Sequence, residues 1–307
     1  MNYFLGIDGG GSTIRAALID GEKKVLAHFK LHRNSNPTST GFAYLKETLE
    51  LIRQQIIIYC KGIKMIMINL AGVGASQQLT KTKEIVKEVF FETTNVQVYH
   101  DAHGSLLANS PEEASMLVIC GTGSVIVGKD EDEHFYRAGG WGFLLGDEAS
   151  GFWLVKRLFQ EYLAYYDGIR EDNRSFDVFR EKFEVEPRDA LYRFYEAHYR
   201  RGTAALSTVF LDREYPLAQQ IIKQGIITVI NSLKSMKERI KDEVKSIIYM
   251  GGMFESPFFL QEFEHILQEK IPFKKGKKDI EIELAMIGKE KMGEINNEYS
   301  SFDQTST

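Results

Sequence analysis

The chain has 307 residues, of which 43% are hydrophobic and 26% charged, and its formal net charge at pH 7 is -5. This length and composition suffice for a full core in one or two domains. The net acidity argues against a nucleic acid or an anionic membrane surface as the main partner. The two cysteines, Cys60 and Cys120, form neither a disulfide framework nor a metal-binding spacing. With no segment of roughly 18 uncharged apolar residues and no leader, we expect a cytoplasmic protein.

The N-terminal stretch FLGIDGGGSTIRAALID predicts a strand, a glycine-rich turn and a second strand. Residues 14–20 are apolar, short and β-branched at their ends, which favours a strand over a helix after the glycines. A dinucleotide fingerprint or a Walker loop would need a helix there, and the Gly-Lys-Ser/Thr sequence is also missing. Taken alone, these residues fit either a phosphate-binding hairpin or a hairpin whose glycines serve only the turn.

The rest of the chain alternates strands and helices in an α/β pattern. Further strands are expected over residues 23–29, 65–70, 96–100, 115–120, 124–128, 134–138, 246–253 and 279–284. Helices are expected over residues 42–56, 80–91, 257–268 and within a long helical stretch over residues 151–241. Glycines and hydroxyl residues again separate two strands at CGTGS, so the second half begins as the first does.

Two phosphate-type hairpins in equivalent places of two halves indicate a duplicated unit. We expect one domain over residues 1–114 and a second over residues 115–284. A C-terminal helix over residues 285–300 could complete the first domain. Two similar domains that face each other would leave a cleft between them, where ligand sites commonly lie.

Several motifs follow one another in a distinctive order. They are Asp8-Gly9-Gly10-Gly11-Ser12, Asn36-Pro37, Ala71-Gly72-Val73-Gly74, Asp101-Ala102, Gly121-Thr122-Gly123-Ser124, GGWGFLLGDEASG over residues 139–151, and Gly251-Gly252. Together they resemble the N-acetylglucosamine kinase family within the BadF/BadG/BcrA/BcrD-type ATPases. The resemblance implies two ribonuclease H-like domains of the actin, Hsp70 and sugar-kinase superfold. Residues 282–288 depart from it, because they lack the proline of the family's last motif.

The resemblance also implies how ATP and its metal are bound. The residues that would contact ATP and its phosphates are Gly9, Gly10, Gly11, Ser12, Thr13, Gly121, Thr122, Gly123, Ser124, Gly251 and Gly252. Asp8 would hold Mg²⁺ through water, because Mg²⁺ keeps much of its hydration shell. The alternative for Asp8 is a turn-forming aspartate.

The same resemblance places Asp101 as the catalytic base, which accepts the proton of the attacking sugar hydroxyl. The sugar would contact Asn36, Asp101, Gly140, Trp141, Gly142 and Asp147. Each assignment has a plainer alternative. Asp101 could cap the helix that follows it, Trp141 could be a buried aromatic wedge, and Asp147 could mark a helix start.

The leading hypothesis is an ATP- and Mg²⁺-dependent kinase that converts N-acetylglucosamine to its 6-phosphate. Glucosamine or N-acetylmuramic acid are alternative acceptors, and a non-catalytic sugar or nucleotide sensor with the same fold is a further alternative. An electron-transfer activator of the same group would need exposed cysteines for an iron-sulfur cluster. Sugar and ATP are the expected partners, without nucleic acid or membrane, and the resemblance suggests a homodimer.

Overall fold

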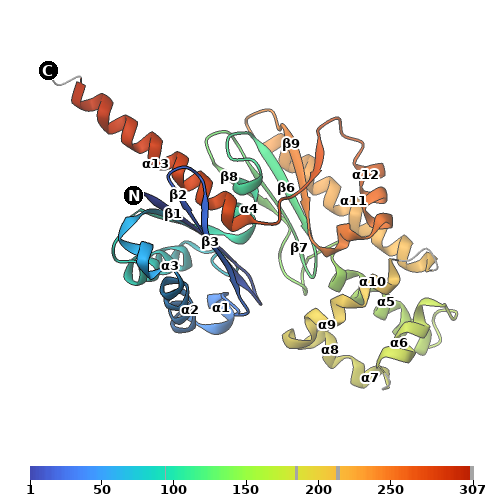
Figure 1. Cartoon of the computed structure of the whole chain (residues 1–307). Coiled ribbons are helices and arrows are strands. Elements are labelled where there is room, and N and C mark those ends of the chain that lie inside the picture. Colours follow the sequence, from blue (N-terminus) through green and yellow to red (C-terminus); the bar gives the residue numbers. More distant parts are fainter. Residues whose placement is uncertain (94, 184–185, 212–214, 305–307) are drawn as a thin grey trace. The chain divides into compact units, whose positions relative to one another are not determined.

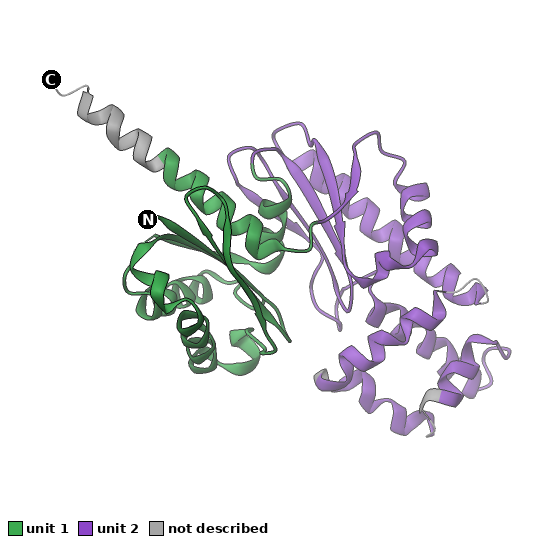
Figure 2. Cartoon of the chain, viewed as in Figure 1, with its two compact units in different colours: residues 1–111, 277–307 green, residues 112–276 purple. Residues whose placement is uncertain are grey.

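The computed structural model describes residues 1–93, 95–183, 186–211 and 215–304. The chain forms two compact units, residues 1–111 with 277–307 and residues 112–276 (Figure 1, Figure 2). Each unit contains one five-stranded sheet with helices packed against it. The predicted α/β fold class with two similar halves is therefore confirmed.

The first unit has the strand order β3-β2-β1-β4-β5. Its strands are β1 (Tyr3–Gly9), β2 (Ile14–Asp20), β3 (Val25–Leu31), β4 (Ile63–Leu70) and β5 (Val96–His100). The first three strands pair antiparallel, whereas β4 and β5 run parallel to β1. Because β1, β4 and β5 are parallel, their carboxyl ends meet at one edge of the sheet, where α/β proteins commonly bind ligands.

Helices cover both faces of this sheet. They are α1 (Pro37–Thr40), α2 (Phe42–Gln55), the 3-10 helix η1 (Ile57–Gly62), α3 (Ser76–Val89), α4 (Asp101–Asn109) and α13 (Ile280–Gln304). Apolar residues of α2 and α3 at helical spacing share one buried core with alternate residues of β1, such as Leu5 and Ile7. The opposite face of β1, at Gly6, lies against α13.

The last helix overturns one prediction. The strand expected over residues 279–284 is wrong, because α13 begins at Ile280. Alternating Ile280, Ile282 and Leu284 resemble a strand over so short a run, but burial follows the helical spacing. Ile280, Leu284 and Ile287 are 3%, 0% and 5% exposed. Because α13 packs on β1, β2, β4 and α4, it belongs to the first unit.

The second unit repeats the same strand arrangement in the order β10-β9-β6-β7-β8. Its strands are β6 (Ser115–Cys120), β7 (Ser124–Lys129), β8 (Phe135–Ala138), β9 (Ser246–Met250) and β10 (Phe273–Lys275). The strands β6, β7 and β8 form an antiparallel meander, and β9 runs parallel to β6. The glycine turn between β6 and β7 thus occupies the place that the turn between β1 and β2 has in the first unit.

The long helical stretch of the second unit is divided into several helices. They are α5 (Gly151–Tyr166), α6 (Ser175–Phe183), α7 (Pro187–Ala190), α8 (Tyr192–Tyr195), η2 (Ala197–Tyr199), α9 (Arg200–Ala205), α10 (Ser207–Phe210) and α11 (Pro216–Arg239). After β9 follow η3 (Gly252–Glu255) and α12 (Pro257–Leu267). Within the described ranges, no helix combines the length and apolarity that a membrane span requires.

Candidate active site

The first glycine turn joins β1 to β2. Gly10 N donates to Thr13 O at 2.9 Å and closes the turn. Ser35, which follows β3, donates to Gly10 O from its backbone N and from its hydroxyl, each at 3.1 Å. A Cβ on Gly11 would meet no described atom within 4 Å. The backbone at Gly11 is therefore open to an approaching anion.

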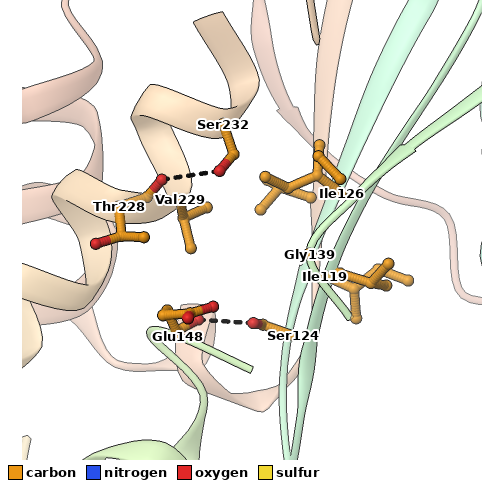
Figure 3. A pocket seen from close by; sticks show the side chains of 11 residues that line it. Ile119, Ser124, Ile126, Gly139, Glu148, Thr228, Val229 and Ser232 are labelled. Carbon is orange, nitrogen blue, oxygen red and sulfur yellow. Dashed lines mark hydrogen bonds between the residues drawn. The ribbon is translucent and has the colours of Figure 1, made fainter. Parts of the chain in front are cut away.

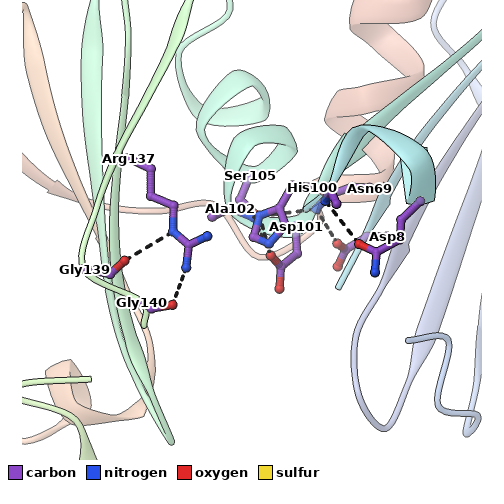
Figure 4. Close-up of polar contacts among 11 residues, drawn as sticks. Asp8, Asn69, His100, Asp101, Ala102, Ser105, Arg137, Gly139 and Gly140 are labelled. Atoms are coloured by element: carbon purple, nitrogen blue, oxygen red, sulfur yellow. Dashed lines mark hydrogen bonds and ion pairs between the residues drawn. The ribbon is translucent and has the colours of Figure 1, made fainter. Parts of the chain in front are cut away.

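Asp8 lies at the end of β1, close to the carboxyl end of β4 (Figure 4). Asn69 Nδ2 donates to Asp8 Oδ1 at 2.8 Å, and Arg15 NH1 lies 3.5 Å from Asp8 Oδ2. Burial raises the pKa of Asp8 to about 6, and the negative charges of Glu281 and Asp101 act in the same direction. Asn69 was not predicted as a site residue; its signal in the sequence is a single amide at the end of the apolar run over residues 65–70, and the structure buries it fully.

The raised pKa of Asp8 predicts a pH-dependent stability difference. Its pKa rises from the ordinary 3.8 to about 6 on folding, so ionisation of Asp8 costs stability as the pH rises through this range. Asp8→Asn should therefore raise the free energy of unfolding by up to about 3 kcal/mol at pH 7. The gain should shrink as the pH falls through about 6 and vanish below about 4.

Urea unfolding of both proteins across this pH range measures the difference. Glu22→Gln, an exposed change on the turn after β2, serves as the control and should give no such pH trend. An Asp8→Asn gain that is equal at pH 4 and pH 7 would contradict the assigned direction.

Asp101 is the first residue of α4 and directly follows β5. Its side chain is 45% exposed, and its Oδ1 lies 2.9 Å from His100 Nδ1. Ala102 N donates to the same Oδ1 at 2.9 Å. His100 occupies the cap position of α4, and its Nδ1 lies 3.4 Å from the same Ala102 N, so Asp101 and His100 both contact this first-turn amide. A half-exposed carboxylate with this anchoring can accept a proton from a bound hydroxyl.

Asn36 brings two of the motifs into contact. Its Oδ1 caps α1 by accepting from Thr38 N at 2.9 Å and from Thr38 Oγ1 at 2.6 Å. A Cβ on Gly72 would lie 1.9 Å from the same Oδ1, so the loop after β4 packs directly on this side chain. Because Oδ1 is engaged with the helix, Nδ2 is the part of Asn36 that can donate to a sugar hydroxyl.

The second glycine turn joins β6 to β7 and is held by the start of α5. Gly121 N donates to Gly123 O at 2.8 Å, and Gly151 N donates to Gly121 O at 2.8 Å. Ser124 Oγ donates to Glu148 O at 2.6 Å. The Ser124 hydroxyl therefore ties the turn to the following loop, and Thr122 is the hydroxyl residue within the turn itself.

Gly251, at the end of β9, lies against the base of this turn. Its φ is +106°, and a Cβ there would lie 2.2 Å from Cys120 O. Both the left-handed backbone and the close approach require glycine at this position. A Cβ on Gly121 would lie 3.8 Å from Gly252 N. The glycine pair and the second hairpin are thus in contact within the second unit.

The loop over residues 139–150 connects β8 to α5 through an unusual backbone. Positive φ angles occur at Gly139, Gly140, Gly142, Asp147 and Ala149. Arg137 supports the start of the loop, because its Nε donates to Gly139 O at 3.2 Å and its NH2 donates to Gly140 O (Figure 4). Left-handed angles at non-glycine residues persist only where the surroundings hold them, so this loop is tightly determined by its contacts.

Trp141 projects from the loop and is 72% exposed. The alternative of a buried aromatic wedge is therefore wrong. The Arg137 guanidinium lies 5.5 Å from the centre of the Trp141 ring, within the range of a cation-π contact. Leu144 and Leu145 are 67% and 84% exposed, so the same loop carries two further exposed apolar side chains.

Asp147 is only 3% exposed. Its Oδ2 lies 3.0 Å from NH2 of Arg200, the first residue of α9. The helix-start alternative for Asp147 is wrong, because Ser150 caps α5 by accepting from Trp153 N at 3.2 Å. Burial raises the pKa of Asp147, whereas the charge of Arg200 opposes the rise. Arg200 was not predicted as a site residue, since nothing in its local sequence distinguishes it from the other arginines of this helical stretch.

A small pocket lies behind the second hairpin within the second unit (Figure 3). Its polar lining residues are Ser124, Glu148, Thr228 and Ser232, and the rest of the lining is mainly apolar. The Thr228 and Ser232 hydroxyls donate to carbonyls of α11 at 3.1 Å each. These hydroxyls serve the helix, and a pocket lined in this way lacks the convergent polar groups that a sugar or phosphate needs.

The comparison with known families decides the classification. The family model of the BadF/BadG/BcrA/BcrD ATPases matches residues 5–287 of the chain. The chain belongs to this family.

Two relatives align in sequence with most of this member of the ATPase family. The N-acetylmuramic acid/N-acetylglucosamine kinase of Clostridium acetobutylicum is 24% identical over 292 residues, which cover 89% of this chain and 92% of that one. The N-acetyl-D-glucosamine kinase of Dictyostelium discoideum is 23% identical over 294 residues, which cover 87% of this chain and 89% of that one. A solved structure from Chromobacterium violaceum, provisionally described as an N-acetylglucosamine kinase, has a TM-score of 0.70 at 20% identity and covers 94% of this chain and 99% of that chain. This likeness shows a shared fold.

The predicted residues of this BadF/BadG/BcrA/BcrD-type ATPase fall into two groups. Those on the first unit are Asp8, Gly9, Gly10, Gly11, Ser12, Thr13, Asn36 and Asp101. Those on the second unit are Gly121, Thr122, Gly123, Ser124, Gly140, Trp141, Gly142, Asp147, Gly251 and Gly252. Within each unit the residues gather around the glycine turn and the neighbouring strand ends.

Proposed function

We propose that this chain is an ATP-dependent kinase that transfers a phosphoryl group to an amino sugar. N-Acetylglucosamine is the first candidate, with its 6-hydroxyl as the acceptor. The observation that carries the proposal is a pair of carboxylates at the same edge of the first sheet, the largely buried Asp8 on β1 and the half-exposed Asp101 after β5, with β4 between these strands. The proposal is supported by two kinase relatives that match about nine tenths of the chain.

Phosphoryl transfer requires positioning and charge neutralisation more than covalent chemistry from the protein. Asp101 would accept the proton of the sugar hydroxyl as that oxygen attacks the γ-phosphorus. Its exposure leaves room for a substrate, and the bond from Ala102 N orients its carboxylate. The backbone amides of the two glycine turns would donate to phosphate oxygens.

Asp8 suits a Mg²⁺ ion that is bound through water. A single carboxylate is enough for Mg²⁺, which retains several waters when it accompanies nucleotide phosphates. The pKa of about 6 leaves Asp8 ionised at pH 7, and Asn69 fixes one of its two oxygens. When bound with ATP, Mg²⁺ neutralises part of the phosphate charge.

The family resemblance assigns the sugar to Asn36 and to the loop over residues 139–150. Asn36 Nδ2 can donate to a hydroxyl, and the exposed ring of Trp141 offers an apolar face of the kind that packs against a sugar ring. The exposure of Trp141 favours a ligand role, since a ring that packs only in the core would be covered.

Trp141→Ala tests this assignment. Because the ring is 72% exposed, its loss should change the thermal unfolding midpoint little. The sugar KM should rise about tenfold or more, as expected when an aromatic contact to a ligand is lost, while the ATP KM stays unchanged. Leu145→Ala is the control, since this residue of the same loop is also highly exposed and is not assigned to the sugar. An unchanged sugar KM would remove Trp141 from the site.

Other functions within the family are less well supported. An iron-sulfur activator needs accessible thiolates, but Cys60 and Cys120 are 2% and 0% exposed, and burial raises the pKa of both thiols. A non-catalytic sensor would have no need of a base at Asp101. We further propose that the protein is cytoplasmic. The family resemblance also suggests a homodimer, and light scattering of the purified protein would test this oligomeric state.

A coupled assay of ADP release tests the proposed function. The full chain is mixed with ATP and Mg²⁺ and offered N-acetylglucosamine, N-acetylmuramic acid, glucosamine and glucose in parallel. We expect sugar-dependent ADP release with one clear preference, and phosphorus NMR of the product should place the phosphate on O6. If no sugar of the panel causes ADP release, while calorimetry shows that a sugar binds, the kinase hypothesis would be overturned in favour of the sensor hypothesis.

A further inference from the structure

The Asp147 carboxylate is held by groups from three parts of the second unit. Backbone amides of Ser124, on β7, and of Gly142, in the same loop, donate to it. Arg200 NH2, on α9, lies 3.0 Å from its Oδ2. The second hairpin, the loop over residues 139–150 and the helical segment that carries α9 therefore meet at one side chain.

The Arg200 guanidinium lies directly against the second hairpin. A Cβ on Gly123 would lie 2.6 Å from Arg200 NH2 and 2.6 Å from Asp147 Oδ2. The guanidinium carbon also lies 5.3 Å from the centre of the Phe143 ring, which belongs to the loop. Arg200 Nε is buried and has no hydrogen-bond partner among the described residues. The guanidinium thus fills the space between the turn and the loop.

We propose that Arg200 is a positioning residue, which fixes Asp147 so that the second hairpin and the loop carrying Trp141 keep one geometry. The inference rests on the proposed function, because that function assigns ATP binding to the second hairpin and sugar binding to the loop. The loop needs such support, since Asp147 and Ala149 have φ angles of +62° and +61°. Arg200 acts on the reaction through Asp147 and is not itself assigned a contact with the substrate.

Loss of Arg200 would leave a buried carboxylate without its nearest cation. Charged groups near Asp147 are Arg200, which favours its ionised form, and Glu148, which opposes it. Lys156 also lies within the electrostatic range of Asp147, whereas Cys120 is a buried neutral thiol. Without Arg200 the pKa of Asp147 should rise further, so protonation should begin at a higher pH.

Arg200→Met tests the positioning role. We expect kcat/KM for the preferred sugar to fall about 10- to 100-fold, as when a hydrogen bond to a charged group is lost. The acid limb of the pH profile of kcat/KM should move to higher pH, which a merely structural loss would not cause. Arg200→Lys should restore part of the activity, because it keeps the charge but loses the planar fork.

Arg170→Met is the matched control. Arg170 Nε lies 3.0 Å from Glu161 Oε2 in the same unit, but its side chain is 60% exposed. Removal of this surface pair should leave both kcat/KM and the pH profile unchanged. Wild-type kcat/KM and an unshifted acid limb in folded Arg200→Met protein would overturn the inference.

A double-mutant cycle keeps the inference testable if Arg200→Met folds poorly. Asp147→Asn, Arg200→Met and the double variant are compared by kcat/KM and by thermal unfolding midpoint. If Arg200 and Asp147 act together, the double variant should lose no more kcat/KM and no more thermal stability than the more damaged single variant. Additive losses in the double variant would overturn the pairing. If the wild-type chain phosphorylates no sugar, the proposed function fails, and the unfolding cycle still decides whether Arg200 holds Asp147.

Discussion

Replacing Asp101 by asparagine should lower kcat for sugar phosphorylation by about 10²- to 10⁴-fold, the usual contribution of a general base. Asparagine keeps an oxygen that can accept from Ala102 N, so the start of α4 should remain intact. What it loses is the capacity to take the proton of the attacking hydroxyl. Steady-state kinetics at saturating ATP and sugar, with thermal unfolding to verify the fold, measure the effect.

Glu50→Gln is the control for this substitution, since it removes an exposed carboxylate from α2 of the same unit. Its kcat should equal that of the wild-type chain. If folded Asp101→Asn protein keeps its turnover, Asp101 is not the base, and the remaining explanation for its position would be local support of α4.

Gly6→Ala should destabilise the protein by about 3 kcal/mol or more, which is large for a single methyl group. A Cβ on Gly6 would lie 1.9 Å from Glu281 O and 2.7 Å from Ala285 N, both in the backbone of α13. The helix would have to move away from β1, whose end carries Asp8. We therefore expect kinase activity to fall together with stability. Guanidinium unfolding measures the free energy, and the coupled assay measures the activity.

Gly293→Ala is the matched control on the same helix. A Cβ on Gly293 would meet no described atom within 4 Å, and the position is exposed. Alanine has a higher helix propensity than glycine, so this change should stabilise the protein by up to about 1 kcal/mol. Equal stability of Gly6→Ala and wild type would show that α13 does not pack on β1 in solution.

Features that depend on neighbouring residues were predictable from the sequence. The two glycine turns and their flanking strands follow from β-branched apolar runs separated by glycines, because adjacent antiparallel strands pair locally. The internal repeat of this pattern indicated two similar halves, and the structure has them. The position of Asp101 after β5 also followed, since a polar residue that directly follows a parallel strand lies at the carboxyl edge of the sheet.

The end of the chain shows where local pattern is insufficient. Over residues 279–284 a strand and a helix place nearly the same apolar residues on one face, and six residues are too few to separate the two periods. Packing against β1, β2 and β4 favours the helical conformation of α13, because a helix there buries Ile280, Leu284 and Ile287 together.

The sequence by itself determined the hairpins, the two similar halves and the identity of the motif residues, because each depends on residues close together in the chain. Only the tertiary structure decided the partners of the buried carboxylates. Asn69 is 61 residues from Asp8, and Arg200 is 53 residues from Asp147. Such pairs form because folding removes a carboxylate from water and then requires a donor for it, and the packing of distant elements selects which side chain supplies that donor.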